Sequence, residues 1–148
     1  MRLMSLLLSA VGVSLLSGCA SLMSVSAPVI AILKDDLFTG TAVGYVDRTG
    51  KIEVTSVLNP DTQCIGNFAY VGTKMGKGEL HCNDGSTGTF QFNGLTLFSG
   101  YGFGTMTRGS MSFTFGLNTD EAAEYLRLPK GKELRGAVKD KSASLVDI

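Results

Sequence analysis

The chain has no tryptophan, one histidine (His81), three cysteines and three prolines in 148 residues. A single histidine limits acid–base chemistry, and the Gly-x-Ser-x-Gly pattern of an esterase nucleophile is absent, so we do not expect an enzyme. An excess of one charge sign is also missing, since 13 basic residues balance 13 acidic residues. A nucleic-acid binder would carry a clustered basic surplus, so no nucleic-acid partner is expected.

The first eighteen residues have the pattern of an export signal. Arg2 supplies a positive charge, and residues 3–16 form a mainly apolar stretch that is shorter than the roughly 20 residues of a bilayer-spanning helix. We therefore predict that residues 1–18 are a signal peptide that is removed from the mature protein.

The segment Leu16-Ser17-Gly18-Cys19 resembles the lipobox of bacterial lipoproteins. The resemblance implies cleavage before Cys19, acylation of its sulfur and of its new α-amine, with palmitate among the acyl groups, and a membrane-held product. Ala20 follows the cysteine, which by similarity to enterobacterial lipoproteins implies the outer membrane. We expect the domain to face the periplasm, although Ala20 does not decide between the two sides of that membrane. Two or more acyl chains are enough for stable anchoring.

Residues 19–37 are predicted to be a lipid-anchored tether. Serines and Pro28 indicate a flexible lead, which is followed by the apolar run Val29–Leu33. This run is too short for a stable isolated helix, so we expect it to dock on the domain or on another protein.

Residues 38–128 are predicted to be an all-β domain that ends in one short helix. Apolar residues over 38–116 recur with a period of two, and turn signals interrupt them at short, even intervals. Strands at this spacing favour an antiparallel up-and-down meander, closed as a small barrel or folded as a two-layer sandwich. About seven strands are expected, at 38–47, 51–57, 63–71, 76–83, 86–93, 100–107 and 110–116.

Strand registers follow from the alternation. Pairing Cys64 with Cys82 places Phe68 opposite Gly78 and Tyr70 opposite Gly76, so that rings cover bare backbone. The last hairpin is predicted to pair Met106 with Met111, Gly104 with Phe113 and Gly102 with Phe115 around an Arg108-Gly109 turn. Matching faces across the middle hairpin requires a three-residue loop or a bulge near Asp84-Gly85.

The C-terminal region changes character at Asn118. Asn118 and Glu121 have capping-box spacing, which predicts a helix over 119–128 that caps an open end of the sheet and stops at Pro129. Residues 129–148 are mostly polar, so a loosely ordered tail is expected, with a final strand near Leu145-Val146.

Cys64 and Cys82 remain once Cys19 is lipidated. Their facing register in an exported protein predicts a disulfide. His81 precedes Cys82 in the same strand and points to the opposite face, next to Glu79, so no metal site and no cofactor are expected.

Two aromatic residues, Tyr101 and Phe103, lie on the face opposite Gly102 and Gly104. If they face outward they are candidates for partner binding. The alternative is that the helix at 119–128 covers them.

The body also resembles small, uncharacterised glycine-rich proteins exported by proteobacteria, in segments such as Gly76–Gly85 and Phe113–Gly116. That resemblance implies a β-rich envelope protein and no particular activity. The Gly-Lys-Gly…Asp-Gly segment is slightly similar to MORN hairpins, without their Tyr-x-Gly order. Periplasmic lysozyme inhibitors share the expected β-barrel architecture and periplasmic location, but their signature loop is absent from this sequence.

Three functions are compatible with these features. The leading hypothesis is a non-catalytic interaction or inhibitor module of the cell envelope, with an envelope protein as partner. The second is a carrier or sensor of a small apolar ligand inside the barrel, suggested by the glycine-rich strands and by Met106 and Met111. The third, an enzyme, is disfavoured by the single histidine.

Overall fold

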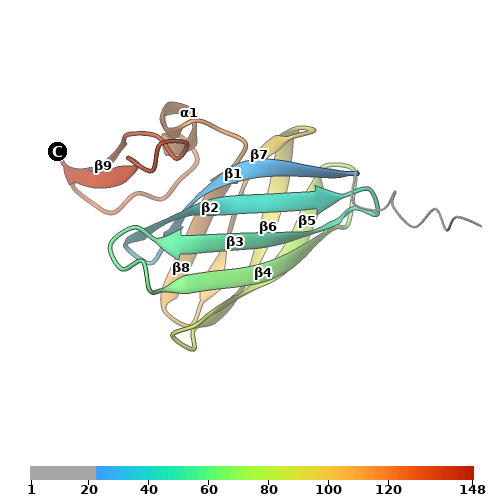
Figure 1. Ribbon diagram of the computed structural model, residues 1–148, viewed down its shortest axis with the longest axis horizontal. Helices are drawn as coiled ribbons and strands as arrows, with labels where there is room; N and C mark the ends of the chain where they lie inside the picture. Colours follow the sequence, from blue (N-terminus) through green and yellow to red (C-terminus); the bar gives the residue numbers. More distant parts are fainter. Residues whose placement is uncertain (1–22) are drawn as a thin grey trace, which may run out of the picture.

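The computed structural model describes residues 23–148, so the predicted signal peptide (1–18) and Cys19 lie outside the described residues. Eight antiparallel strands pair in chain order, and β8 pairs with β1 to close a barrel (Figure 1). This confirms the predicted antiparallel meander and gives it the form of a barrel rather than a sandwich. The strands are β1 (Ser24–Leu33), β2 (Asp36–Tyr45), β3 (Thr49–Ser56), β4 (Gln63–Tyr70), β5 (Met75–Cys82), β6 (Thr87–Thr96), β7 (Ser99–Met106) and β8 (Gly109–Phe115).

β1 is the strand that the sequence pattern did not reveal. The prediction that residues 19–37 form a tether is wrong for most of that segment, since Ser24–Leu33 is a barrel strand. Within Val29–Leu33, alternate residues face the barrel interior, while Ile30 and Ile32 face outward into a second apolar cluster. A strand covered on both faces loses the alternation that identifies a half-buried strand, so the run did not show a period of two.

The C-terminal region forms a small second layer outside the barrel, next to β1 (Figure 1). It contains α1 (Thr119–Ala123) and a two-stranded sheet of β9 (Lys132–Arg135) and β10 (Ser144–Asp147). The predicted final strand is confirmed, but the expectation of a loosely ordered tail is wrong. The layer is ordered because apolar residues from it gather over the outer face of β1; the buried ones are Ala122, Leu126, Leu134 and Ala143.

The predicted helix is present but shorter than 119–128. Asn118 caps its start, and the capping box with Glu121 forms as expected. The helix ends at Ala123, and the chain continues through turns in which Leu126 N donates to Ala122 O at 3.1 Å, which brings Leu126 into the cluster on β1. The helix therefore covers an outer face and does not cap an open end of the barrel. Within residues 23–148 no helix is long and apolar enough to cross a membrane.

Strand pairing confirms the register of β4 and β5, with Cys64 opposite Cys82 and Tyr70 opposite Gly76. The register predicted for β7 and β8 is wrong by two residues, since Gly104 pairs with Met111. The turn comprises residues 107–108, because Gly109, with φ of +141°, ends the turn rather than forming part of it. A shift of two preserves which face each side chain occupies.

The middle hairpin has the predicted three-residue loop. Cys82 N donates to Ser86 O at 2.8 Å, which leaves residues 83–85 as the turn. Gly85 has φ of +90°, as expected for the last residue of a type I turn closed by a left-handed residue.

A candidate ligand-binding mouth at one end of the barrel

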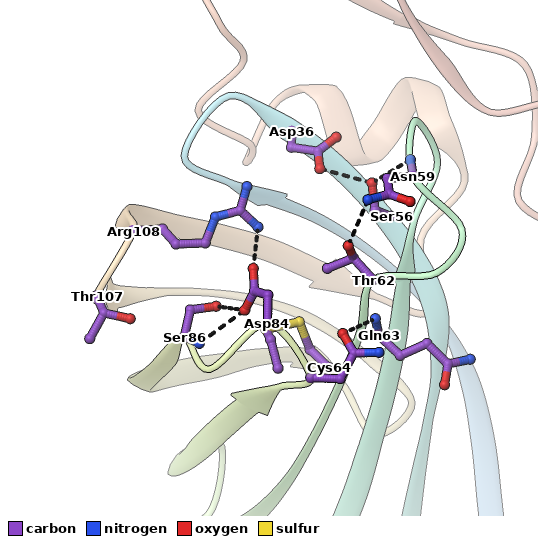
Figure 2. Close-up of polar contacts among 12 residues, drawn as sticks. Asp36, Ser56, Asn59, Thr62, Gln63, Cys64, Asp84, Ser86, Thr107 and Arg108 are labelled. Atoms are coloured by element: carbon purple, nitrogen blue, oxygen red, sulfur yellow. Dashed lines mark hydrogen bonds and ion pairs between the residues drawn. A yellow bond between two sulfur atoms is a disulfide. The ribbon is translucent and has the colours of Figure 1, made fainter.

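The end of the barrel at which β1, β3, β5 and β7 finish is closed by polar loops (Figure 2). Ser56 Oγ donates to Asp36 Oδ2 at 2.8 Å and accepts from Asn59 N at 3.0 Å. In the neighbouring loop, Asp84 Oδ1 accepts from both the backbone N and the Oγ of Ser86, at 2.9 Å and 2.6 Å. The side chains at this end therefore hold the turns together.

The other end of the barrel is open and apolar, and we refer to it as the mouth. It holds a cavity of about 610 Å³, which is within the usual size of small-molecule sites. The lining comes from the start of β1, the end of β2 and the turns that join β2 to β3, β4 to β5 and β6 to β7. Its apolar residues include Val25, Ala27, Ala42, Tyr70, Leu97, Phe98 and Phe115.

Aromatic rings form the floor of the mouth. Phe68, Tyr70 and Phe115 line the mouth, and Phe92, which lines only the smaller cavity beneath them, makes edge-to-face contacts with all three, with centroid distances of 5.6, 5.0 and 5.9 Å. Such contacts add about 0.5–1.5 kcal/mol per pair beyond simple burial. Below this floor is a second cavity of about 40 Å³ that shares Phe68, Tyr70 and Phe115 with the mouth. The rings thus separate the open mouth from a nearly filled interior.

Glycines in the strands make room for these rings. Phe92 on β6 lies over Gly76 on β5, and Phe113 on β8 lies over Gly102 on β7. In both cases the glycine is on the strand just before that of the ring. The ring of Phe68 follows the same rule and covers Gly50 on β3. Rings do cover strand glycines, as predicted, but by different residues: Phe90 covers Gly78 and Phe92 covers Gly76, in place of Phe68 and Tyr70.

Arg48 is a cationic residue at the edge of the mouth. Its Nη2 donates to the carbonyl oxygens of Gly72 and Thr73, and its guanidinium carbon is 4.7 Å from the centroid of Tyr70. These contacts extend the side chain from the β2–β3 turn to the β4–β5 turn. Arg48 has φ of +67°, a conformation that costs a non-glycine residue about 1–3 kcal/mol. Lys74 adds a second cation to the lining.

The turn around Arg48 belongs to a motif that occurs three times within residues 23–148. In Asp47-Arg48-Thr49, Asp84-Gly85-Ser86 and Asp140-Lys141-Ser142, the aspartate accepts from the backbone N and hydroxyl of the residue two positions on. The middle residue has positive φ in each. Hydrogen bonds from the Ser or Thr side chain are the main reason that the pKa of each aspartate is lowered. The Asp-x-Ser/Thr spacing, visible in the sequence at all three places, is the signal from which this motif can be predicted.

The predicted disulfide is present. Cys64 and Cys82 are bonded across β4 and β5, and both are buried in the barrel interior. His81 points outward, as expected, with its Nε2 3.6 Å from Glu79 Oε2. Among residues 23–148, no group of three or more His, Cys, Asp or Glu side chains is arranged to hold a metal ion.

The candidate partner-binding residues Tyr101 and Phe103 both lie on the outer face of β7, away from the mouth. Tyr101 stacks on Tyr125, just beyond α1, with ring centroids 4.7 Å apart. Phe103 remains 42% exposed. The C-terminal layer therefore covers one of the two aromatics and leaves the other at the surface.

The fold and the mouth define this chain as a small closed β-barrel with one open apolar end. A search of the solved structures finds a similar redesigned β-barrel, with a TM-score of 0.52 and 13% identity, over 70% of this chain and 98% of that chain. At this identity the similarity establishes the fold alone. No protein-family model and no curated protein matches the sequence.

Proposed function

We propose that this protein is a lipid-anchored, non-catalytic binding module of a bacterial cell envelope, and that its mouth holds an apolar chain with an anionic head group. The observation that carries the proposal is the open apolar cavity of about 610 Å³ with Arg48 at its edge. Apolar walls with a few placed polar groups are typical of ligand sites. The lipobox residues and the Cys64–Cys82 disulfide support an exported, envelope-bound protein.

The position of Arg48 favours an anionic head group. Only Nη2 of its guanidinium is used in the contacts with the β4–β5 turn, which leaves Nη1 and Nε as donors for a carboxylate or phosphate. A cation at the edge of an apolar cavity matches a fatty acid or a lysophospholipid, because the acyl chain fills the cavity while the head group stays at its edge, beside Arg48.

Binding of cis-parinaric acid, a fluorescent fatty acid, tests this function in the purified chain. Gly44→Phe should weaken binding at least about tenfold, a loss of ~1.4 kcal/mol, because the new ring would enter the mouth. A Cβ at Gly44 meets only Val25 O, at 4.0 Å, so the barrel accepts the substitution. Thr89→Phe adds the same ring on the exposed outer face of β6 and is the matched control.

A second pair of variants tests the head group. Arg48→Gly keeps the positive φ of the turn and removes the cation, so affinity should fall for the fatty acid but not for the fatty alcohol of equal length. Arg108→Gln removes one cation at the opposite end of the barrel and should change neither affinity. The proposal would be rejected if the wild type did not bind cis-parinaric acid, or if Gly44→Phe bound it as tightly as the wild type does.

The protein-interaction hypothesis retains one supporting observation, the exposed ring of Phe103 on β7. A photoreactive amino acid at position 103 should then capture one dominant envelope protein in cells. The same probe at Ile65, an exposed outward residue of β4, is the control. Equal, diffuse crosslinking at the two positions would contradict a partner site on β7.

A further inference from the structure

Most large exposed hydrophobic side chains of the described residues gather at the mouth end of the barrel. Four separate segments contribute to this apolar rim, which we define as Met23, Val46, Val71, Leu97 and Phe98. Val46, Val71, Leu97 and Phe98 lie in or beside three hairpin turns, where water-exposed polar residues are the usual choice. A concentration of apolar side chains at the tips of unconnected turns indicates a surface that is covered in use.

The opposite end of the barrel has the reverse character. Its turns contain Lys34-Asp35, Asn59-Pro60-Asp61, Asn83-Asp84-Gly85 and Thr107-Arg108, with Leu58 as an isolated exposed hydrophobic residue. The two ends therefore differ in polarity although they belong to the same set of eight strands.

The two ends of the barrel also differ in charge: basic residues predominate in the turns at the mouth, and acidic residues predominate in the turns at the opposite end. The turns at the mouth carry Arg48 and Lys74 against one acid, Asp47. The turns at the opposite end carry Asp35, Asp61 and Asp84 against two basic residues, Lys34 and Arg108. Basic residues beside an apolar surface suit a membrane interface, where they meet anionic lipid head groups.

The N-terminal segment reaches the same end. β1 begins at Ser24, so Met23 is at the mouth, and Cys19 precedes Met23 by four residues. Four residues span at most about 14 Å. From the rim, the charge and this spacing, we propose that the mouth end docks on a lipid bilayer, with the apolar rim in the membrane interface.

This orientation goes beyond anchoring and does not depend on a ligand in the mouth. A lipid on Cys19 alone would leave the barrel free to take any orientation, whereas an inserted rim fixes the barrel with its polar end away from the membrane. Interfacial amphipathic helices bury their apolar faces about 5–10 Å into the head-group and acyl boundary, and we expect the rim to reach a similar depth. The mouth would then open onto lipid rather than onto water.

Depth-dependent fluorescence quenching tests the orientation in the full chain, purified from cell membranes and reconstituted in vesicles of phosphatidylethanolamine and phosphatidylglycerol. A bimane probe is placed at Leu97→Cys and, as the matched control, at Leu58→Cys. These leucines are 81% and 84% exposed and lie at opposite ends of the barrel, so neither change disturbs the core. Wild-type chain treated with the same reagent reports any labelling of Cys19.

The expected result is a blue-shifted probe at position 97 that doxyl-labelled lipids quench at least about twofold more than the probe at position 58. Equal quenching at both positions, or failure of the chain to associate with vesicles, would overturn the proposal. A blue shift at 97 without lipid quenching would also overturn it, by showing that a protein or a second copy covers the rim. Gly44→Phe should keep the quenching at 97, which separates this test from fatty-acid binding in the mouth.

Discussion

The ring of Phe92 occupies the space that a side chain on Gly76 would need. A Cβ built at Gly76 falls 2.2 Å from Phe92 Cζ and 2.6 Å from the backbone oxygen of Ala69. Phe92 also contacts Phe68, Tyr70 and Phe115, so this single glycine allows the aromatic floor of the mouth to assemble.

Gly76→Ala should therefore lower the free energy of unfolding by about 1–3 kcal/mol, the usual cost of overpacking. Gly44→Ala is the matched control, because its Cβ enters open space and should add about 0.4–1 kcal/mol by restricting the unfolded chain. Urea midpoints measure both changes. A Gly76→Ala variant as stable as the wild type would mean that Phe92 moves aside without cost.

Removal of the disulfide should destabilise the barrel without changing its topology. Cys64 and Cys82 are 18 residues apart in sequence. Closing a loop of this size is worth about 3 kcal/mol in the chain-entropy account. The double variant Cys64→Ala, Cys82→Ala should unfold at lower denaturant concentration, and added reductant should shift the midpoint of the wild type but not that of the variant. A wild type insensitive to reductant under unfolding conditions would contradict the prediction.

The C-terminal layer should contribute to stability through its apolar contacts with β1. Leu134 is 8% exposed in the cluster with Ile30 and Ile32. Leu134→Ala should cost about 2–3 kcal/mol, within the range for buried leucines. Leu58→Ala removes an equal volume from an exposed position and should change stability by less than about 0.5 kcal/mol. Thermal unfolding of the two variants separates packing of the layer from a general effect of the substitution.

The loop of Asp84 should lose its contribution to stability in acid. The Ser86 hydroxyl, then the Ser86 backbone N–H and then Arg108 lower the pKa of Asp84 in the folded state. Because the folded pKa is lower than the unfolded one, the stabilisation is present above about pH 4 and disappears as pH falls through the lowered pKa. Asp84→Asn should therefore be less stable than the wild type at pH 7, and the difference should shrink at pH 3. A difference that is constant with pH would show that the carboxylate charge has no part in the loop.

The alternation of residues in β4 and β5 was sufficient to predict the Cys64–Cys82 bond. The two strands are joined by a short hairpin, and among the registers that keep the apolar residues on one face, the predicted one sets Cys64 directly opposite Cys82, which is the register observed. The loop over residues 83–85 and the capping box at Asn118 were predictable for the same reason, since each depends on residues close together in the chain.

The shift of two residues between β7 and β8 was not predictable from alternation, because it leaves every side chain on the same face. Only the geometry of the turn distinguishes the two registers. The place of Gly109 in that turn depends on its backbone conformation, which the sequence Arg108-Gly109 does not determine.

The sequence by itself determined the local pairings, the antiparallel meander and the disulfide, because these follow from the alternation of neighbouring residues. The tertiary structure alone decided that Val29–Leu33 closes the barrel, since this strand pairs with β8 at the far end of the domain and is buried on both faces. It also decided that Arg48, Tyr70 and Phe98 meet around one mouth. Their proximity arises from closure of the barrel, which brings together turns that are separated by tens of residues.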